Sequence, residues 1–242
     1  MRMANIHTVT LTVMHTEKIL NGLPDLRLMQ LVSPSLPIGA FTYSQGLEWA
    51  VENSQVKDSD DVYNWMTGLI EDGLSYLDIP VFKRLYQAFQ EDNENDVTYW
   101  SEYLVASRET SELRQEENNR GRALTSLLID LEVVGAAKYQ QSLQLTQLSG
   151  FALAAFSWNI PLKQAALGYA WGLIENQVAA AIKLVPLGQT AGQKLLMKLS
   201  GLLPQAVETG LSAEDEEIGA SAPAMAIASS LHETQYTRLF RS

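Results

Sequence analysis

Apolar residues recur at steps of three and four through most of this chain. The spacing is clear where Val62, Trp65, Met66 and Leu69 fall on one side of a helix. A half-buried strand would instead show alternating β-branched residues, and no such run occurs over 26–242. The sequence therefore predicts an all-α fold.

One multi-helix domain is expected over 26–242, because no repeat and no break in composition separates the helices. Residues 1–25 are expected to form a flexible N-terminal segment with at most a short strand over 8–13. Prolines and glycines set the expected helix ends. The expected helices cover 26–32, 41–52, 59 to a boundary at Pro80, 81–90, 97–107, 110–131, 143–158, 161 to a stop at Pro186, 190–208 with a weak point near Pro204, and 224–231.

Charge and composition exclude several classes of protein. The formal net charge is −11, which disfavours nucleic acid as a partner because phosphates need a basic surface. The chain has no cysteine, so disulfides and thiolate sites are excluded. The three histidines, His7, His15 and His232, are too few for a zinc or nickel site of imidazoles. We expect a cytoplasmic protein, because neither a membrane span nor a signal peptide is evident.

Two nucleotide-binding or catalytic patterns fail on spacing. Residues 188–195 look like a phosphate-binding loop, but three residues rather than four separate Gly188 from Gly192. No Gly-x-Ser-x-Gly motif occurs, and the histidines lie at the two chain ends. The first pattern is better explained as a turn that leads into a helix.

Carboxylate pairs are the remaining route to an enzyme. Asp60 and Asp61 have no further carboxylate four residues on, and capping of a helix explains them. Glu116 and Glu117 are interpreted as a solvated helix face. A helical metal enzyme that uses carboxylates is kept as the alternative function.

Two segments resist such plain explanations. Residues 33–48 (SPSLPIGAFTYSQGLE) are either a rigid connection between helices or a stiff platform that displays Tyr43 and Ser44 to a partner. Residues 232–242 (HETQYTRLFRS) contain Tyr and Arg, the residue types that dominate interfaces. This segment either docks on its own domain or becomes ordered on a partner, and both can hold.

These two segments, with RETSELR at 108–114 and LVPLGQTAGQKLL at 184–196, resemble the urease accessory protein F (UreF) family in content and order. The resemblance spans about 26–242 and implies an all-α, usually dimeric protein without enzymatic activity or catalytic residues. It implies an adaptor that joins the urease D/H accessory protein to the nickel-carrying GTPase UreG on apo-urease. Such an adaptor regulates GTP-dependent nickel insertion, and nickel passes through the assembled complex without a tightly bound cofactor.

The resemblance also assigns residues. Tyr43 and Arg238 match positions that engage the GTPase, and residues 239–242 with their approach from His232 match the segment that orders on the D/H protein. The expected partner-binding residues are Tyr43, Ser44, His232, Glu233, Gln235, Tyr236, Arg238, Leu239, Phe240, Arg241 and Ser242.

Departures from the family pattern are small. Leu231 and Thr237 stand where Arg and Ser are more usual, and Lys183 replaces an Arg. A chaperone that clamps urease without touching the GTPase is a third reading of the same sequence. Because thiols are absent and histidines are scarce, any nickel passage is expected to use transient oxygen ligands.

Overall fold

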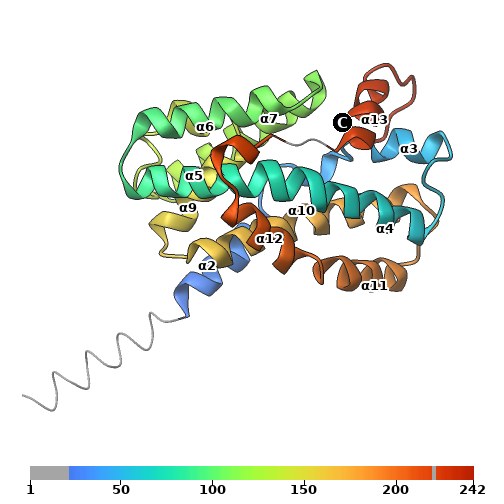
Figure 1. Cartoon of the computed structure of the whole chain (residues 1–242), viewed down its shortest axis with the longest axis horizontal. Coiled ribbons are helices and arrows are strands. Elements are labelled where there is room, and N and C mark those ends of the chain that lie inside the picture. Colours follow the sequence, from blue (N-terminus) through green and yellow to red (C-terminus); the bar gives the residue numbers. More distant parts are fainter. Residues whose placement is uncertain (1–21, 220–221) are drawn as a thin grey trace, which may run out of the picture.

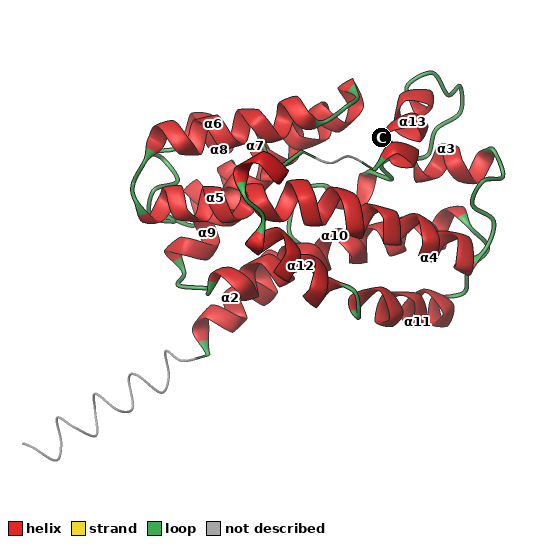
Figure 2. Cartoon of the chain, in the orientation of Figure 1, coloured by secondary structure: helices red, strands yellow, loops and turns green. Residues whose placement is uncertain are grey.

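The computed structural model describes residues 22–219 and 222–242, and within these ranges the chain is helical without a strand (Figures 1 and 2). The expected all-α fold is confirmed. The elements in chain order are α2 (Leu23–Leu31), η1 (Ala40–Thr42), α3 (Leu47–Glu52), α4 (Ser59–Gly68), η2 (Leu69–Asp78), α5 (Ile79–Gln90), α6 (Glu94–Ser107), α7 (Ser111–Asp130), α8 (Gln140–Leu143), α9 (Gln147–Ser157), α10 (Leu162–Leu184), α11 (Gln189–Ser200), α12 (Leu203–Ser212), η3 (Asp215–Glu217) and α13 (Pro223–His232). Here η1 and η3 are 3₁₀ turns, and η2 is a π-helix.

The long helix α10 organises the core, because it packs against α5, α9, α11 and α12. Small residues such as Ala166, Ala170 and Ala181 form part of its buried face and let neighbouring helices approach closely. Gly192 on α11 has the same role, since a Cβ atom there would lie 2.3 Å from Cδ1 of Ile182. The glycine of the apparent phosphate-binding loop therefore serves helix packing.

Residues 59–90 form one continuous helix through α4, η2 and α5, so the break expected at Pro80 is wrong. Ile79 donates its N–H to the carbonyl of Leu74, five residues back, which is the π pattern. An α-helical residue at position 80 would donate to Tyr76, and proline has no such donor. The carbonyl of Tyr76 accepts the N–H of Gly219 at 2.9 Å instead.

The start of this helix agrees with the sequence. The Asp58 carboxylate accepts the N–H groups of Asp60 and Asp61, which caps α4. Both aspartates lie in the first turn, where the helix dipole favours negative charge. The capping role expected for this acidic cluster is confirmed.

The expected segment 1–25 is only partly described. Residues 1–21, with the strand expected over 8–13, lie outside the described residues. Leu23 already begins α2, so the last residues of the expected segment are helical. In the described part of the chain, no helix has the length and apolarity that crossing a bilayer requires.

Candidate functional site

The two segments singled out from the sequence meet in the structure. Residues 233–242, here called the tail, leave α13 and end beside α3, close to the point marked C in Figure 1. The N–H of Arg241 donates to the carbonyl of Thr42 at 2.9 Å. The N–H and hydroxyl groups of Ser44 both donate to the main-chain oxygen of Ser242, at 2.6 and 2.7 Å. The tail thus docks on its own domain, which was one of the two alternatives.

Glu48 is the centre of the docking contacts. This α3 residue is buried, and its Oε1 accepts the N–H of Leu239 at 2.6 Å. Its Oε2 accepts the N–H of Phe240 at 2.8 Å and lies 3.3 Å from Nε2 of His232. One carboxylate therefore holds two consecutive amides of the tail and contacts the last residue of α13.

His232 lies fully buried between two carboxylates. Its Nδ1 is 2.7 Å from Oε2 of Glu112, on the side of the ring opposite Glu48. The other oxygen of Glu112 accepts a hydrogen bond from the Arg238 guanidinium at 2.5 Å. Glu112 thus joins the end of α13 to the tail, and the Arg238 side chain keeps 39% of its surface exposed.

The one acidic residue of the tail, Glu233, caps α7. Thr110 precedes this helix and accepts the N–H of Leu113. Glu233 accepts the N–H groups of Ser111 and Glu112 at 2.8 and 3.2 Å, and the Ser111 hydroxyl at 2.7 Å. The Ser111 hydroxyl and the two amides hold the pKa of Glu233 below its usual range. The first turn of α7 therefore binds the tail as it would bind an anion.

Glu116 and Glu117 are buried, so the interpretation as a solvated helix face is wrong. The hydroxyl of Ser242 lies 3.3 Å from Oε2 of Glu116, and Arg120 pairs with its other oxygen at 2.6 Å. Burial raises the pKa of Glu116, although the charge of Arg120 opposes the shift. Gln45 also donates to this carboxylate.

Arg108 forms a second group of buried contacts with carboxylates, next to Glu116 in the sequence of α7 through Glu117. Its guanidinium contacts Asp78 and Glu117, each at 2.7 Å. Burial raises the pKa of Asp78 despite the nearby Arg108. For Glu117 burial acts in the same direction, but Arg108 and the Thr146 hydroxyl outweigh it, so its pKa is lowered. We call Asp78, Arg108 and Glu117 the core cluster.

Close packing of α13 on the loop before α3 depends on Gly46. This residue has a φ of 83°, in the left-handed region that favours glycine. A Cβ atom at position 46 would lie 2.7 Å from the backbone nitrogen of Ser229. The absence of a side chain therefore lets α13 lie against this loop.

An open groove of about 700 Å³ runs beside the docked tail. Tyr43 and Asn119 from the domain and Arg238 and Arg241 from the tail are among the residues that line it. Tyr43 and Ser44, which were expected to be displayed to a partner, are both buried in this chain. Tyr43 reaches the groove only along its edge, where its hydroxyl lies 3.4 Å from Nδ2 of Asn119.

The remaining tail side chains point in opposite directions. Tyr236 is fully exposed and Leu239 is 68% exposed, whereas Phe240 and Ser242 are buried. Gln235 bonds to Glu52 of α3. The predicted site residues are thus brought together, but they divide into an anchoring set and a presented set.

Comparison with known proteins places this chain in a family. The UreF family model matches residues 56–200. A urease accessory protein UreF of Alkalilimnicola ehrlichii is 50% identical over 91% of this chain and 97% of its own length. Those of Alcanivorax borkumensis and Pseudomonas putida are 48% and 50% identical, over 92% and 90% of this chain and 100% and 97% of their own. The chain belongs to the UreF family of urease accessory proteins.

The acidic residues that hold the tail in this UreF-family site were missed by sequence reasoning. Glu48 and Glu112 are acidic residues on helices, and such residues are ordinarily solvated. A signal was present, because Glu112, Glu116 and Arg120 recur at steps of four. That spacing showed a shared helix face, but it could not show that the tail covers the face.

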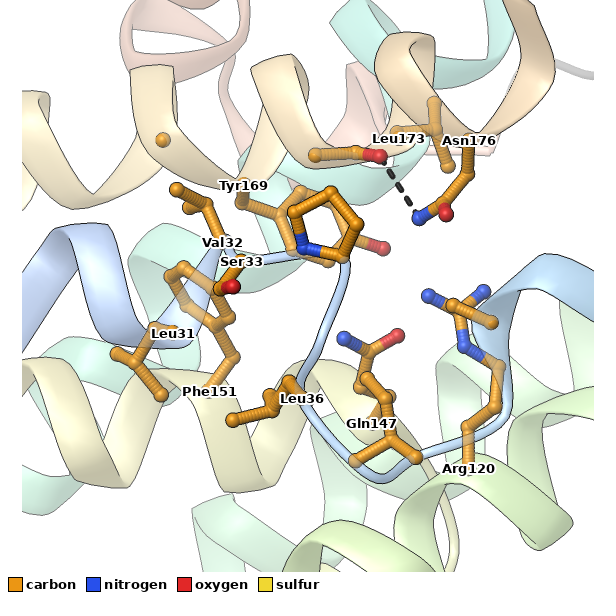
Figure 3. A pocket seen from close by; sticks show the side chains of 15 residues that line it. Leu31, Val32, Ser33, Leu36, Arg120, Gln147, Phe151, Tyr169, Leu173 and Asn176 are labelled. Atoms are coloured by element: carbon orange, nitrogen blue, oxygen red, sulfur yellow. Dashed lines mark hydrogen bonds between the residues drawn. The ribbon is translucent and has the colours of Figure 1, made fainter. Parts of the chain in front are cut away.

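A small internal cavity lies apart from the tail site of this UreF-family chain (Figure 3). Its volume is about 30 Å³, which is room for about one water molecule. Arg120, Gln147 and Asn176 are among the polar side chains that line it. Within residues 22–219 and 222–242, no three acidic or histidine side chains are grouped as a metal site would need.

Proposed function

We propose that this chain is a urease maturation factor that works as a non-enzymatic adaptor in the cytoplasm. It joins the urease D/H accessory protein and the GTPase UreG on apo-urease and regulates GTP-dependent nickel insertion. The observation that carries the proposal is the docked tail, which anchors Phe240 and Ser242 inward and turns Arg238 and Leu239 outward.

The groove beside the tail is the proposed contact for the GTPase. Arg238 and Tyr43 both line it, and Arg is a common hot-spot residue at interfaces. The pairing of Arg238 with Glu112 holds the guanidinium at the edge of the groove. A planar guanidinium in a fixed orientation suits recognition of a carboxylate on the partner.

The outer face of the tail is the proposed contact for the D/H protein. Leu239 and Tyr236 expose apolar surface there, although both belong to an otherwise anchored segment. Exposed apolar side chains on a fixed backbone lose little further entropy on binding. Gln235 and Arg241 belong to the polar rim of this contact.

Nickel is proposed as cargo of the assembled complex, held in passing by oxygen ligands. The described polar groups of the site are carboxylates, amides, hydroxyls and guanidinium groups together with one imidazole, His232. Equilibrium dialysis of the isolated chain against Ni²⁺ should show no tight site, and a tight stoichiometric site would contradict this part. A homodimer is proposed as the working form, to be checked by light scattering.

Arg238→Ala tests the GTPase contact. It should weaken co-purification with UreG and reduce urease activation, because the groove loses one of the two exposed arginines that line it. Arg238→Lys is the matched control, which keeps the charge but not the planar guanidinium. Its UreG binding and urease activation should lie between those of the unmodified chain and of Arg238→Ala. Unchanged activation by Arg238→Ala, with normal helicity, would favour a clamp that does not touch the GTPase.

Leu239→Glu tests the D/H contact more sharply than deletion of the tail, because deletion also removes the buried Phe240. The change places a charge on an exposed apolar position and should weaken association with the D/H protein at least about tenfold. Met197→Glu is the control, since Met197 is similarly exposed but lies on α11 rather than in the tail. Equal binding by both variants would exclude the outer face of the tail as the contact.

A further inference from the structure

Glu48 makes contacts of a kind that ordinary helix acids do not make. Its two oxygens accept N–H groups from consecutive tail residues, Leu239 and Phe240. The carboxylate is buried, so these amides replace the water that would otherwise solvate it. His232 completes the surroundings from the end of α13, at 3.3 Å from Oε2.

We propose that Glu48 is a positioning residue that sets the backbone of the tail, and through it the direction of Arg238 and Leu239, for partner binding. This inference rests on the proposed function, since it assigns to one buried side chain the geometry of the proposed binding surface. Glu48 itself lies beneath the surface and touches no partner.

The two-point contact requires a carboxylate. Glutamine has the same shape, but it offers one acceptor oxygen and one NH₂ donor. In Glu48→Gln, one of the two tail amides would face a donor or lose its partner. A buried N–H without an acceptor is costly, so the segment that supplies these amides would leave its position.

Loss of the Glu48 contact would reach the exposed side chains, because Leu239 belongs both to the anchored backbone and to the exposed surface. Its N–H is fixed by Glu48, whereas its side chain is exposed. Arg238 is the preceding residue, and its main chain continues directly into the held amide. Release of the backbone at Leu239 would therefore free the Leu239 side chain and leave Arg238 held only through its guanidinium, by Glu112.

The experiment measures hydrogen exchange at the Leu239 and Phe240 amides of the full chain, together with co-purification with UreG and the D/H protein. Glu48→Gln should raise the exchange rate of the two amides about tenfold or more, because each loses a charge-assisted bond. It should also weaken binding to both partners. Glu52→Gln is the matched control: it makes the same charge change one turn later on α3 and reaches the tail only through the Gln235 side chain.

Conservative rescue separates positioning from bulk stability. Glu48→Asp keeps two acceptor oxygens and should retain more partner binding than Glu48→Gln, although Asp is shorter by one methylene. If Glu48→Gln does not fold, as judged by circular dichroism, Leu239→Pro removes one of the same hydrogen bonds from the tail side and should give the same loss of partner binding.

Each outcome decides one claim. Unchanged amide exchange in Glu48→Gln would overturn the positioning role. Faster exchange with partner binding equal to that of the unmodified chain would overturn the link between backbone position and binding. If the unmodified chain itself binds neither partner, the proposed function fails, whatever the exchange rates show.

Discussion

The carboxylates of the core cluster and the Glu48 carboxylate of the tail site are all buried, but they are satisfied differently. In the core cluster, Asp78 and Glu117 share the guanidinium of Arg108. In the tail site, Glu48 is satisfied by main-chain amides and contacts an imidazole. One arrangement compensates charge with charge, whereas the other compensates charge mainly with dipoles.

The difference indicates which of the two regions can be disrupted at the lower cost in free energy. Removal of one ion from a buried pair leaves its partner uncompensated, which is among the most destabilising changes a core can suffer. Amides that leave a carboxylate can be replaced by water wherever the segment lies at the surface. We therefore expect the core cluster to support the fold and the tail site to support presentation.

The largest effect is expected from Arg108→Met, which breaks the core cluster. It leaves Asp78 and Glu117 buried without their cation and should cost about 3–5 kcal/mol of unfolding free energy. Urea denaturation followed by circular dichroism measures it. Lys163→Met is the control, because Lys163 pairs with Glu208 at an exposed position and should cost about 0–1 kcal/mol. Similar urea midpoints for the two variants would contradict the larger contribution assigned to the core cluster.

A smaller effect is expected from Thr110→Ala, which acts where the two regions join. The Thr110 hydroxyl caps α7 and lies 2.8 Å from the hydroxyl of Ser229 on α13. Loss of the cap should cost about 1 kcal/mol, measured by the same denaturation. Thr110→Ser keeps the hydroxyl and should stay close to the unmodified chain, so equal losses in both variants would exclude the cap as the cause.

The smallest effect concerns pH and the tail alone. The folded-state pKa of Glu233 is lowered, so its contribution to docking is complete above its ordinary pKa and is lost as pH falls through the lowered value. Asp78 has a raised pKa, so acidification relieves the cost of burying it, whereas the lowered pKa of Glu117 in the same cluster acts in the opposite direction. Below about pH 4, hydrogen-exchange protection of the tail should decrease while that of the core helices persists.

Glu233→Gln provides the control for this pH effect. The amide keeps an acceptor oxygen for α7 but does not titrate, so tail protection should depend less on pH. The same acid-induced loss in both proteins would show that another group controls the tail.

Much of the fold could be predicted from the sequence, because helix periodicity and capping act locally. Asp58 illustrates this, since its cap is formed within three residues. Pro80 illustrates the limit: whether it breaks a helix depends on Gly219, which supplies the missing donor from far along the chain. The candidate site likewise has residues that the sequence reveals locally and residues that only remote contacts reveal.

The residues of the tail were found because Tyr, Arg and Phe are unusual at a chain end. Their anchors were not found, because Glu48 and Glu116 become distinctive only when a remote segment covers them. A glutamate in the sequence gives no sign of whether its side chain will be buried or solvated. Only the contact between residues 42–48 and 239–242 separates the two cases.

Gly46 gives this contact an unexpected vulnerability. The space left by its absent Cβ is occupied by the backbone of α13, so any larger residue there would displace the helix from which the tail starts. Such a change lies far from the tail in sequence and leaves every tail residue intact. In a partner-binding assay it would nevertheless look like a tail mutation, and a genetic screen for tail defects should recover position 46.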